Sequence, residues 1–364
     1  MNVEAPHSLV RHFSPAWYAS VMGTGGLANV LYLFSAEAGF LRPVAIALGW
    51  LNVALFLLFV GPWVARWFLH FDKLTEDLKH PMMSNFFATM PVGALILGTN
   101  FFLMGRSYLP ISFIAGLGIV LWIFAVVAIL FFSVVVIYNM MVSEKMAPEV
   151  VNFSWFITPV ASIVVPLLGN PLVRYYAAAN PEAAQLINLV DISFYGIGMV
   201  LFLIVGSIVF NRLIHHQMPH PMMAPTFWII LGPIGVGTVS LMGVADVSKL
   251  LGLIESTSNM YLLSLVLWGF GLFAFVLTLM INGRYLREAG IPFSLSWWAY
   301  IFPLAAYTMS AYSVSAYLHL APVFWYAALL GALLVVLWVM VFARSLVATL
   351  KGEVLYPKVQ SKLA

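Results

Sequence analysis

The strongest constraint on this chain is a succession of apolar segments, each long enough to cross a lipid bilayer. A helix needs about 20 mostly apolar residues to cross the hydrocarbon core. Of the 364 residues, 63% are hydrophobic and only 8% are charged, which excludes a water-soluble fold. We predict ten membrane-spanning helices, at roughly 14–34, 43–65, 84–104, 111–141, 154–173, 188–211, 225–247, 259–282, 295–317 and 323–343.

Lysine and arginine are unevenly distributed between the two ends of these spans. The side that holds both termini carries twelve of them: Arg11, Arg66, Lys73, Lys79, Lys145, Arg212, Arg284, Arg287, Arg344, Lys351, Lys358 and Lys362. The opposite side carries four: Arg42, Arg106, Arg174 and Lys249. Because cytoplasmic loops are enriched in basic residues, we predict a multi-pass protein of the cell (inner or plasma) membrane with both termini in the cytoplasm. The first span lacks a small-residue cleavage pattern and is expected to be retained. Residues 1–364 are expected to form a single transmembrane domain without a soluble domain.

A repeated motif marks internal duplication. His80-Pro-Met-Met and His220-Pro-Met-Met each open a span, and these spans contain Pro91 and Pro233. Three further odd-numbered spans carry proline in a similar setting, at Pro15, Pro159 and Pro303. Proline lacks an N–H donor and frees backbone carbonyls, which lipid cannot satisfy but a water-filled cavity can. Gly and Pro are common in membrane helices, so a single one carries little information. The alternation of spans with and without proline, however, predicts five helical hairpins around a central pore, with odd helices inner and proline-kinked, and even helices outer.

The composition of the spans supports this division. Spans 4 and 10 are dominated by Leu, Val, Ile, Phe and Ala, which is typical of helices that face lipid, whereas span 1 contains Met22-Gly-Thr-Gly-Gly and span 7 contains Gly232-Pro-Ile-Gly-Val-Gly. Half-helices that start near the prolines would direct their N-terminal dipole ends at the axis and attract anions weakly. The expected pore-lining residues are Gly23, Thr24, Gly25, Pro91, Pro159, Pro233, Gly235 and Pro303.

Charged residues are placed at the ends of the spans, and none lies near a predicted span centre. This placement weakens a proton-coupled mechanism, which usually needs a charge at the bilayer centre. Arg106 and Arg174 end inner spans on the non-cytoplasmic side, where they would attract anions at a vestibule, or alternatively reach lipid head groups. Asp246 and Lys249 are three residues apart and are expected to form an ordinary ion pair.

Other classes of protein find little support in the sequence. Cysteine is absent, and no histidine lies near a span centre where two helices could hold a haem. His216 and His220 have a metal-pair spacing, but Pro219 and Pro221 interrupt any regular helix there. No HExxH sequence, Ser–His pair or paired intramembrane carboxylates occur, and the net charge of +3 is small. We expect no metal, no cofactor, no nucleic-acid partner and no enzymatic activity; a haem or quinone enzyme is the remaining competing class.

Four segments resemble one known family. Phe13-Ser-Pro-Ala-Trp-Tyr, Met22-Gly-Thr-Gly, His80-Pro with Asn85-Phe-Phe, and above all Trp297-Trp-Ala-Tyr-Ile-Phe-Pro are similar to the tellurite-resistance/dicarboxylate transporter family. That family includes tellurite-resistance permeases, fungal malate permeases and sulfite exporters, and plant slow-type anion channels. The resemblance covers essentially the whole chain.

The resemblance implies ten helices in five hairpins and a homotrimer with a pore in each subunit. It also implies a gate, because a phenylalanine on the family's ninth helix blocks the pore, and the matching residue is Phe302. A bulky apolar ring at a constriction prevents hydration of an ion until the ring moves. Phe86 and Phe87, which match an aromatic pair of the family, are weaker candidates for a second constriction. Without the resemblance, ordinary core packing would be the better interpretation of Phe302.

Two functions therefore remain open. In the first, small inorganic or organic anions pass through a channel-like pore that Phe302 gates. In the second, the protein is a proton-coupled carrier of C4-dicarboxylates such as malate, of sulfite, or of tellurite-type oxyanions. A dicarboxylate would benefit from an arginine clamp inside the pathway, and none is visible in the sequence.

Overall fold

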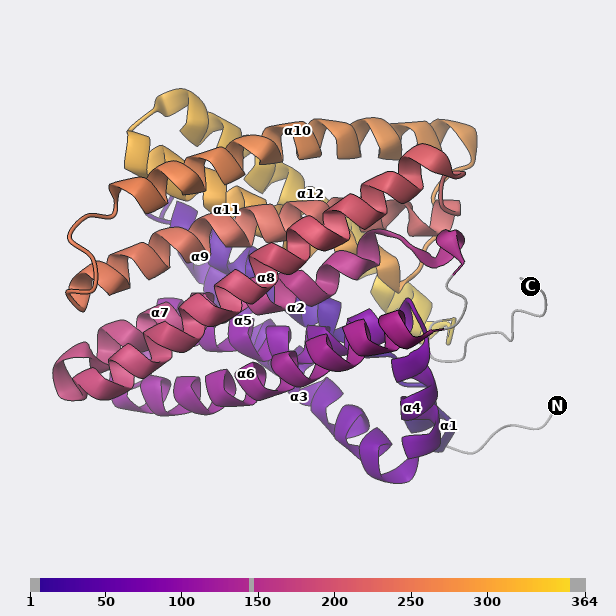
Figure 1. Ribbon diagram of the computed structural model, residues 1–364, viewed down its shortest axis with the longest axis horizontal. Coiled ribbons are helices and arrows are strands. Elements are labelled where there is room, and N and C mark those ends of the chain that lie inside the picture. Colours follow the sequence, from indigo (N-terminus) through magenta and orange to yellow (C-terminus); the bar gives the residue numbers. More distant parts are fainter. Residues whose placement is uncertain (1–6, 144–146, 354–364) are drawn as a thin grey trace.

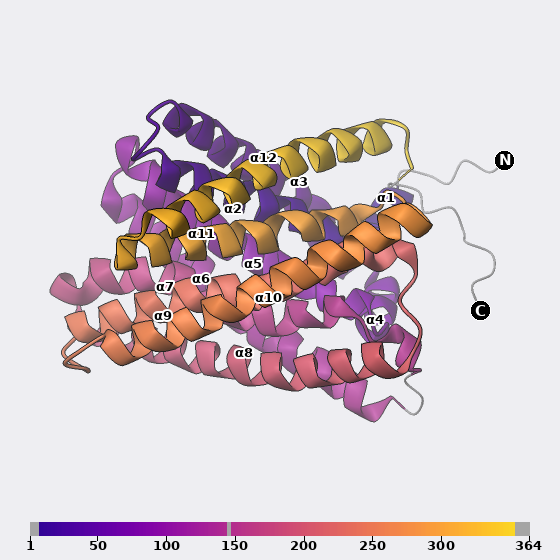
Figure 2. The same cartoon turned by 90° about the horizontal axis from the view of Figure 1, so that it is seen from above.

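The computed structural model describes residues 7–143 and 147–353, so Lys145, Lys358 and Lys362 of the topology prediction lie outside the described residues. The described chain forms helices joined by turns and short connections (Figures 1 and 2). Each predicted span corresponds to one long helix: α2 (Tyr18–Phe34), α3 (Leu41–Leu69), α5 (Thr89–Met104), α6 (Ile111–Val142), α7 (Ile157–Ala179), α8 (Pro181–His215), α9 (Leu231–Leu250), α10 (Ser258–Glu288), α11 (Ile301–Leu318) and α12 (Ala321–Leu350). Two short helices, α1 (His7–Arg11) and α4 (Phe71–Lys79), lie between or before them.

The prediction of an all-helical, multi-pass membrane protein is confirmed. Within the described residues, eight helices are long and apolar enough to cross a membrane. These eight include every predicted span except the first and the ninth, which correspond to α2 and α11. Both of these helices are largely buried by their neighbours, and their crossing of the membrane stays a prediction.

Burial separates the helices into two classes. The spans that contain α5, α7 and α9 are 78, 94 and 89% buried over their most apolar stretch. The same measure is only 22 to 33% for α3, α6, α8, α10 and α12. Since a helix in a bilayer exposes apolar side chains to lipid without cost, the less buried class forms the wall of the molecule. The more buried class, together with α2 and α11, forms its interior.

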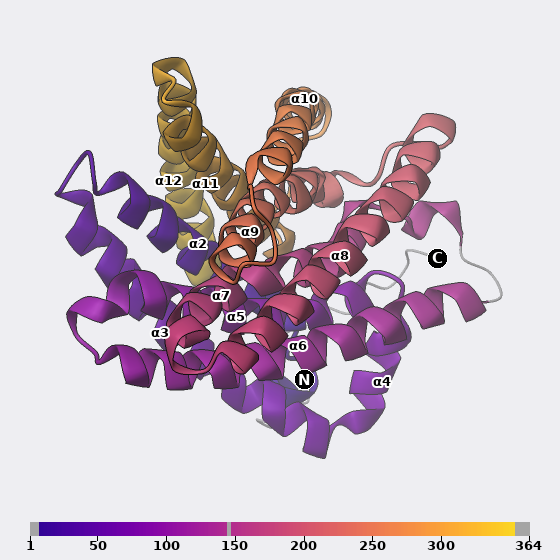
Figure 3. The same ribbon diagram turned by 60° about the vertical axis from the view of Figure 1, so that its left-hand side comes forward.

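The interior helices follow one another around a closed ring. Helix α2 contacts α5, α5 contacts α7, α7 contacts α9, α9 contacts α11, and α11 returns to α2. Each of them also packs against the long helix that follows it in sequence, which gives the pairs α2–α3, α5–α6, α7–α8, α9–α10 and α11–α12. Figure 3, turned partly toward an end-on view, shows α8, α10 and α12 outside their partners.

Every inner helix begins with a 3₁₀ segment. These segments are η1 (Pro15–Trp17), η2 (Met83–Ala88), η5 (Phe153–Phe156), η6 (Pro221–Ile230) and η7 (Leu295–Tyr300). Pro91, Pro159, Pro233 and Pro303 are each the third residue of the α-helix that follows. Proline is tolerated in the first helical turn, where its missing N–H breaks no α-helical hydrogen bond. The expected mid-helix kinks are therefore junctions between 3₁₀ and α-helix.

A polar contact ties the start of each inner helix to its outer partner. Four outer helices donate a side-chain hydrogen bond to a backbone carbonyl two to five residues before the inner 3₁₀ segment, and in the fifth hairpin a tryptophan of η7 donates to the outer helix. The bonds are Arg66 Nη1 to Phe13 O (3.0 Å), Asn139 Nδ2 to Leu78 O (3.0 Å), Arg212 Nε to Pro148 O (3.2 Å), Tyr285 Oη to Pro219 O (2.6 Å) and Trp298 Nε1 to Ser345 Oγ (3.0 Å).

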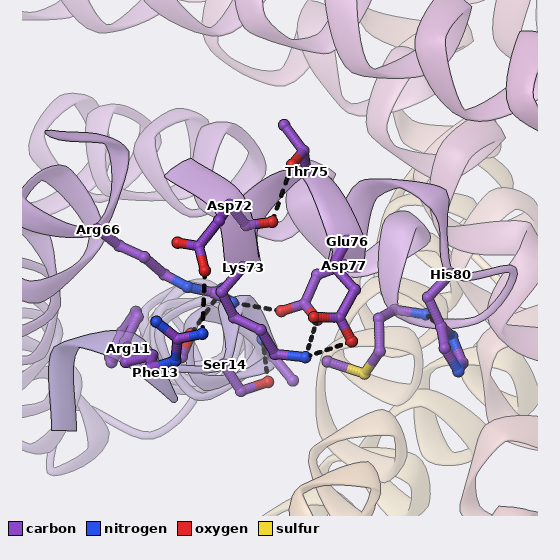
Figure 4. Close-up of polar contacts among 12 residues, drawn as sticks. Arg11, Phe13, Ser14, Arg66, Asp72, Lys73, Thr75, Glu76, Asp77 and His80 are labelled. Carbon is purple, nitrogen blue, oxygen red and sulfur yellow. Dashed lines mark hydrogen bonds and ion pairs between the residues drawn. The ribbon is translucent and has the colours of Figure 1, made fainter. Parts of the chain in front are cut away.

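Helix α4 is a short amphipathic helix that no predicted span covers. Its charged side chains form an ion-pair cluster with the N-terminal segment and α3 (Figure 4). Arg11 Nη2 lies 2.9 Å from Asp72 Oδ2, and Arg66 pairs with Asp77. The backbone N–H of Lys73 and the Arg11 guanidinium together lower the pKa of Asp72. On its other side α4 buries Leu74 and Leu78.

Candidate anion pathway

The inner helices enclose a small cavity at the level of the 3₁₀ junctions. Its volume is about 40 Å³, which is room for a few water molecules at most. Residues of all five inner α-helices and of three 3₁₀ segments line it: Ala19, Met22, Phe86, Thr89, Ile157, Val160, Thr226, Ile229, Gly232, Leu295, Ser296, Trp298, Ala299, Phe302 and Pro303.

Phe302 is one of these lining residues. It is the second residue of α11 and is only 4% exposed. Its ring faces α2 at Gly26, where an added Cβ would lie 3.8 Å from the ring atom Cδ2. Of the residues predicted from the sequence, Phe86, Phe302 and Pro303 are brought together around this cavity. The predicted gate thus lies where the five helices meet.

Phe87 lies elsewhere. Its ring centroid is 5.6 Å from that of Phe132 on the outer helix α6, and it shares a buried cluster with Leu74 and Leu78 of α4. Neighbouring side chains in a 3₁₀ segment point in different directions, so only one member of the predicted aromatic pair reaches the axis.

Glycines expected to line the pore lie instead at helix contacts. A methyl group at Gly23 would come within 3.0 Å of Ile301 Cγ2, and one at Gly235 would overlap the backbone of Ala306 and Tyr307. Thr24 accepts a hydrogen bond from Trp338 Nε1 of α12 (3.1 Å). Small residues let membrane helices approach closely, which is the role that these positions have here.

Gly25 takes part in a buried amide network. Asn100 Nδ2 donates to Gly25 O (3.0 Å) and to Asn29 Oδ1 (2.6 Å), while Asn52 Nδ2 donates to Asn100 Oδ1 (2.9 Å). The network joins α2, α3 and α5. Of the eight predicted lining residues, only Pro303 borders the central cavity; Pro91, Pro159 and Pro233 occupy the equivalent junction position without bordering it.

The hydroxyl groups of the cavity donate hydrogen bonds to backbone carbonyls. Thr89 Oγ1 donates to Phe86 O (2.6 Å) and Thr226 Oγ1 donates to Met223 O (2.6 Å), each three residues earlier. Ser296 Oγ donates to Met222 O in the neighbouring 3₁₀ segment (2.9 Å). No lining residue carries a formal charge, so the wall is apolar with hydroxyl groups turned toward the backbone.

The two predicted vestibule arginines differ from each other. Arg106 is exposed in η3 (Gly105–Ser107). Arg174 Nη2 lies 3.2 Å from Asp246 Oδ2, and Asp246 Oδ1 also accepts a hydrogen bond from Tyr261 Oη (2.9 Å). The expected pairing of Asp246 with Lys249 is corrected, since Arg174 reaches Asp246 from the adjacent helix. The charge of Arg174 is partly compensated by Asp246, so Arg106 presents the stronger positive field.

One buried carboxylate, that of Asp191, was not predicted from the sequence. Asp191 is the eleventh residue of α8 and is fully buried between α6 and α7. Its Oδ1 accepts a hydrogen bond from Trp122 Nε1 (3.1 Å), and Gly169 of α7 leaves the space that its carboxylate fills. Its Oδ2 has no partner among the described residues. The predicted span began at residue 188, whereas α8 begins at Pro181, which places Asp191 deeper than expected.

The known proteins to which this chain is similar are channels and transporters. Residues 12–346 match the family model SLAC1, described as a voltage-dependent anion channel. An uncharacterized transporter of Methanocaldococcus jannaschii is 36% identical over 312 residues, covering 85% of this chain and 86% of the relative. A sulfite efflux pump of Trichophyton rubrum is 27% identical (82% and 80% covered). A malic acid transport protein of Schizosaccharomyces pombe is 21% identical (98% and 84% covered).

Proposed function

The chain belongs to the SLAC1 family of voltage-dependent anion channels and transports anions across a membrane, and from this premise we propose that it is a channel-like pore for small anions. In this proposal the pore follows the axis of the five inner helices within each protomer. Phe302 closes it at the 3₁₀ junctions, and Phe86 narrows it at the same level. The predicted family resemblance is confirmed, and the family's members are transporters and channels, not enzymes.

One observation supports this proposal above the others. The cavity that contains Phe302 is bordered by the first or second residue of four inner α-helices: Thr89 of α5, Ile157 of α7, Gly232 of α9 and Phe302 of α11. The first turns of a helix lie toward the positive end of its dipole, which favours an anion. Here the 3₁₀ segments continue each helix beyond these residues, so the cavity lies near the positive ends and not at free backbone N–H groups. Four such ends around one axis favour anions without a fixed positive charge that would hold them tightly.

The lining residues also bear on the substrate. No arginine or lysine borders the cavity, so a dicarboxylate would have no bidentate partner there. The pathway therefore suits small monovalent anions such as chloride and nitrate, and singly charged forms of oxyanions such as sulfite.

The test is anion flux in proteoliposomes with Phe302→Ala beside the wild-type protein. Removing the ring would open the constriction, and we expect flux of chloride or nitrate to rise at least tenfold, independently of a proton gradient. Phe102→Ala is the matched control. Phe102 is as buried as Phe302, with 4% of its surface exposed, and it lies on inner helix α5, outside the cavity lining. Equal flux in wild type and Phe302→Ala, with both proteins folded, would contradict the gate.

The second candidate is a proton-coupled carrier, and Asp191 is the observation that favours it. A carboxylate buried within a membrane helix, with one oxygen unpartnered among the described residues, is a common site of proton binding. The relatives named as a sulfite efflux pump and a malic acid transport protein fit this function as well. For a carrier, Asp191→Asn would abolish uptake of malate or sulfite that is driven by a pH gradient. For the channel proposed above, the same variant would conduct like the wild type.

The remaining parts of the proposal concern the whole assembly. We propose a homotrimer with one pore in each subunit, on the strength of the family resemblance, and both termini in the cytoplasm, on the strength of the basic-residue distribution. Arg106, and more weakly the paired Arg174, would attract anions toward the opposite mouth.

A further inference from the structure

A second and much larger cavity opens at the end of the molecule that carries both described chain ends, His7 and Glu353. Its volume is about 1070 Å³. It lies between the end of α8, η4 (Pro148–Val150) and the start of η6. Four histidines line this basin, namely His80, His215, His216 and His220, together with Arg212 and Glu149. The two copies of the repeated His-Pro-Met-Met motif thus meet at one cavity.

Arg212 is the side chain that makes this basin more than a surface hollow. It is only 6% exposed, although it lies within one turn of the end of α8. Its Nε donates to Pro148 O (3.2 Å), whereas its buried Nη1 has no hydrogen-bond partner among the described residues. A buried guanidinium with an unmet donor is costly, and an anion that reaches Arg212 from the basin would reduce that cost.

In two of the histidines, a hydrogen bond determines which ring nitrogen carries the proton. His80 Nδ1 accepts from the backbone N–H of Met82 (3.2 Å) and His220 Nδ1 accepts from that of Met222 (3.3 Å). Because an accepting Nδ1 is unprotonated, the proton of each neutral ring is on Nε2. Each motif therefore offers one histidine Nε2–H donor, while Nδ1 accepts the hydrogen bond from the backbone.

The hydrogen-bond donors around the basin suit a negative ligand. Arg212 and Glu149 are the two formally charged residues among the described lining residues, and the histidines add N–H donors. Tyr285 of α10 donates its hydroxyl hydrogen to the backbone carbonyl of Pro219, another lining residue of the basin (2.6 Å).

We propose that this basin is a binding site for small inorganic oxyanions, with Arg212 as the binding residue and histidine N–H groups as additional donors. The planar guanidinium offers two parallel donors that match two oxygens of nitrate or sulfite, so oxyanions bind more tightly than chloride. The inference rests on the proposed anion transport, in which the basin concentrates anions at one mouth of the pathway.

The test uses thermal unfolding of the purified full-length protein in detergent, with nitrate replacing gluconate at constant ionic strength. Ligand that binds the folded state raises the Tm in a saturable manner. We expect Arg212→Gln to raise the half-saturating nitrate concentration about tenfold, the effect of losing one charge-assisted contact. His220→Asn keeps a capping acceptor and removes the Nε2 donor, and it should raise that concentration about threefold. Chloride should bind the wild type more weakly than nitrate.

The control is Arg287→Gln, which removes an exposed arginine from the last turn of α10 at the same end of the molecule, outside the basin. It should titrate like the wild type. If Arg212→Gln fails to fold, the His220→Asn titration decides the matter alone. Identical nitrate titrations of wild type and every folded basin variant would overturn the site. The readout needs no transport: nitrate stabilisation that depends on Arg212 would support the site even where Phe302→Ala shows no flux.

Discussion

Gly235 shows how closely the inner helices approach at single residues. Its Cα faces the backbone of α11 at Ala306 and Tyr307, and no space remains for a methyl group. Gly269 on outer helix α10 has no neighbour within 4 Å of an added Cβ. Two glycines of one membrane protein thus have opposite roles, since only the first permits a helix contact.

We therefore expect Gly235→Ala to destabilise the protein by about 2 kcal/mol or more, because the methyl group forces α9 away from α11. Gly269→Ala should leave stability unchanged or raise it slightly, since alanine favours the helix. Thermal unfolding in detergent compares the two variants with the wild type. Equal unfolding temperatures for both variants would show that the α9–α11 contact is looser than described.

At the residue scale, the sequence predicted part of the lining of the central cavity. Phe302, Phe86 and Pro303 border the central cavity. The match to family motifs identified the two phenylalanines, and the alternation of prolines identified Pro303. The directions of Gly23, Thr24 and Gly25 were not predictable, because an inner helix is apolar on every side and its sequence does not mark the face toward the axis. Asp191 carried a visible signal, an acidic residue within an apolar run.

At the scale of elements, the amide network of Asn29, Asn52 and Asn100 joins three helices of the first two hairpins. In a membrane, apolar side chains gain nothing by leaving lipid, so hydrogen bonds and close packing fix which helices associate. The network holds an outer helix and two inner helices at one point.

We expect Asn100→Leu to cost about 2 kcal/mol, because it leaves the Asn52 amide, the Asn29 amide oxygen and the Gly25 carbonyl without their partner. The double variant Asn52→Leu/Asn100→Leu should cost less than the sum of the two single variants, since fewer polar groups are left unpaired. A double-mutant cycle by denaturant or thermal unfolding measures this coupling. Strictly additive effects would argue against the network.

The existence of the ten long helices was predictable from the sequence, and details at their ends were not. Helix α4 is short and highly charged, so it lacks the apolar run on which the span prediction depends. A proline in an apolar segment is compatible with a kink or with a helix start, and tertiary contacts decide between them. The hydrogen bonds that tie outer helices to the chain at the start of each inner helix use Arg66, Asn139, Arg212, Tyr285 and Ser345, and no common residue type would have shown them.

At the scale of the whole molecule, the closed ring depends on the contact between α2 and α11, which lie at opposite ends of the sequence. The alternation of proline-bearing and smooth spans predicted inner and outer helices. It did not show how the ring closes, because that contact carries no local signal.

The absence of cysteine from the sequence allows a clean test of orientation. Glu255 and Glu353 are exposed at opposite ends of the molecule, one between α9 and α10 and the other after α12. In intact cells, a membrane-impermeant maleimide should label Glu255→Cys and should label Glu353→Cys only after the membrane is opened. The reverse pattern would place both termini outside the cytoplasm and contradict the positive-inside assignment.

The 3₁₀ segments give the molecule a mechanical property. A 3₁₀ helix rises about 2.0 Å per residue and an α-helix about 1.5 Å, so rewinding the six residues of η7 as α-helix would shorten this segment by about 3 Å. It would also turn everything beyond it, Phe302 first, by about 20° for each rewound residue. Each inner helix thus has an overwound segment at its start, and the overwound segment of α11 ends two residues before Phe302.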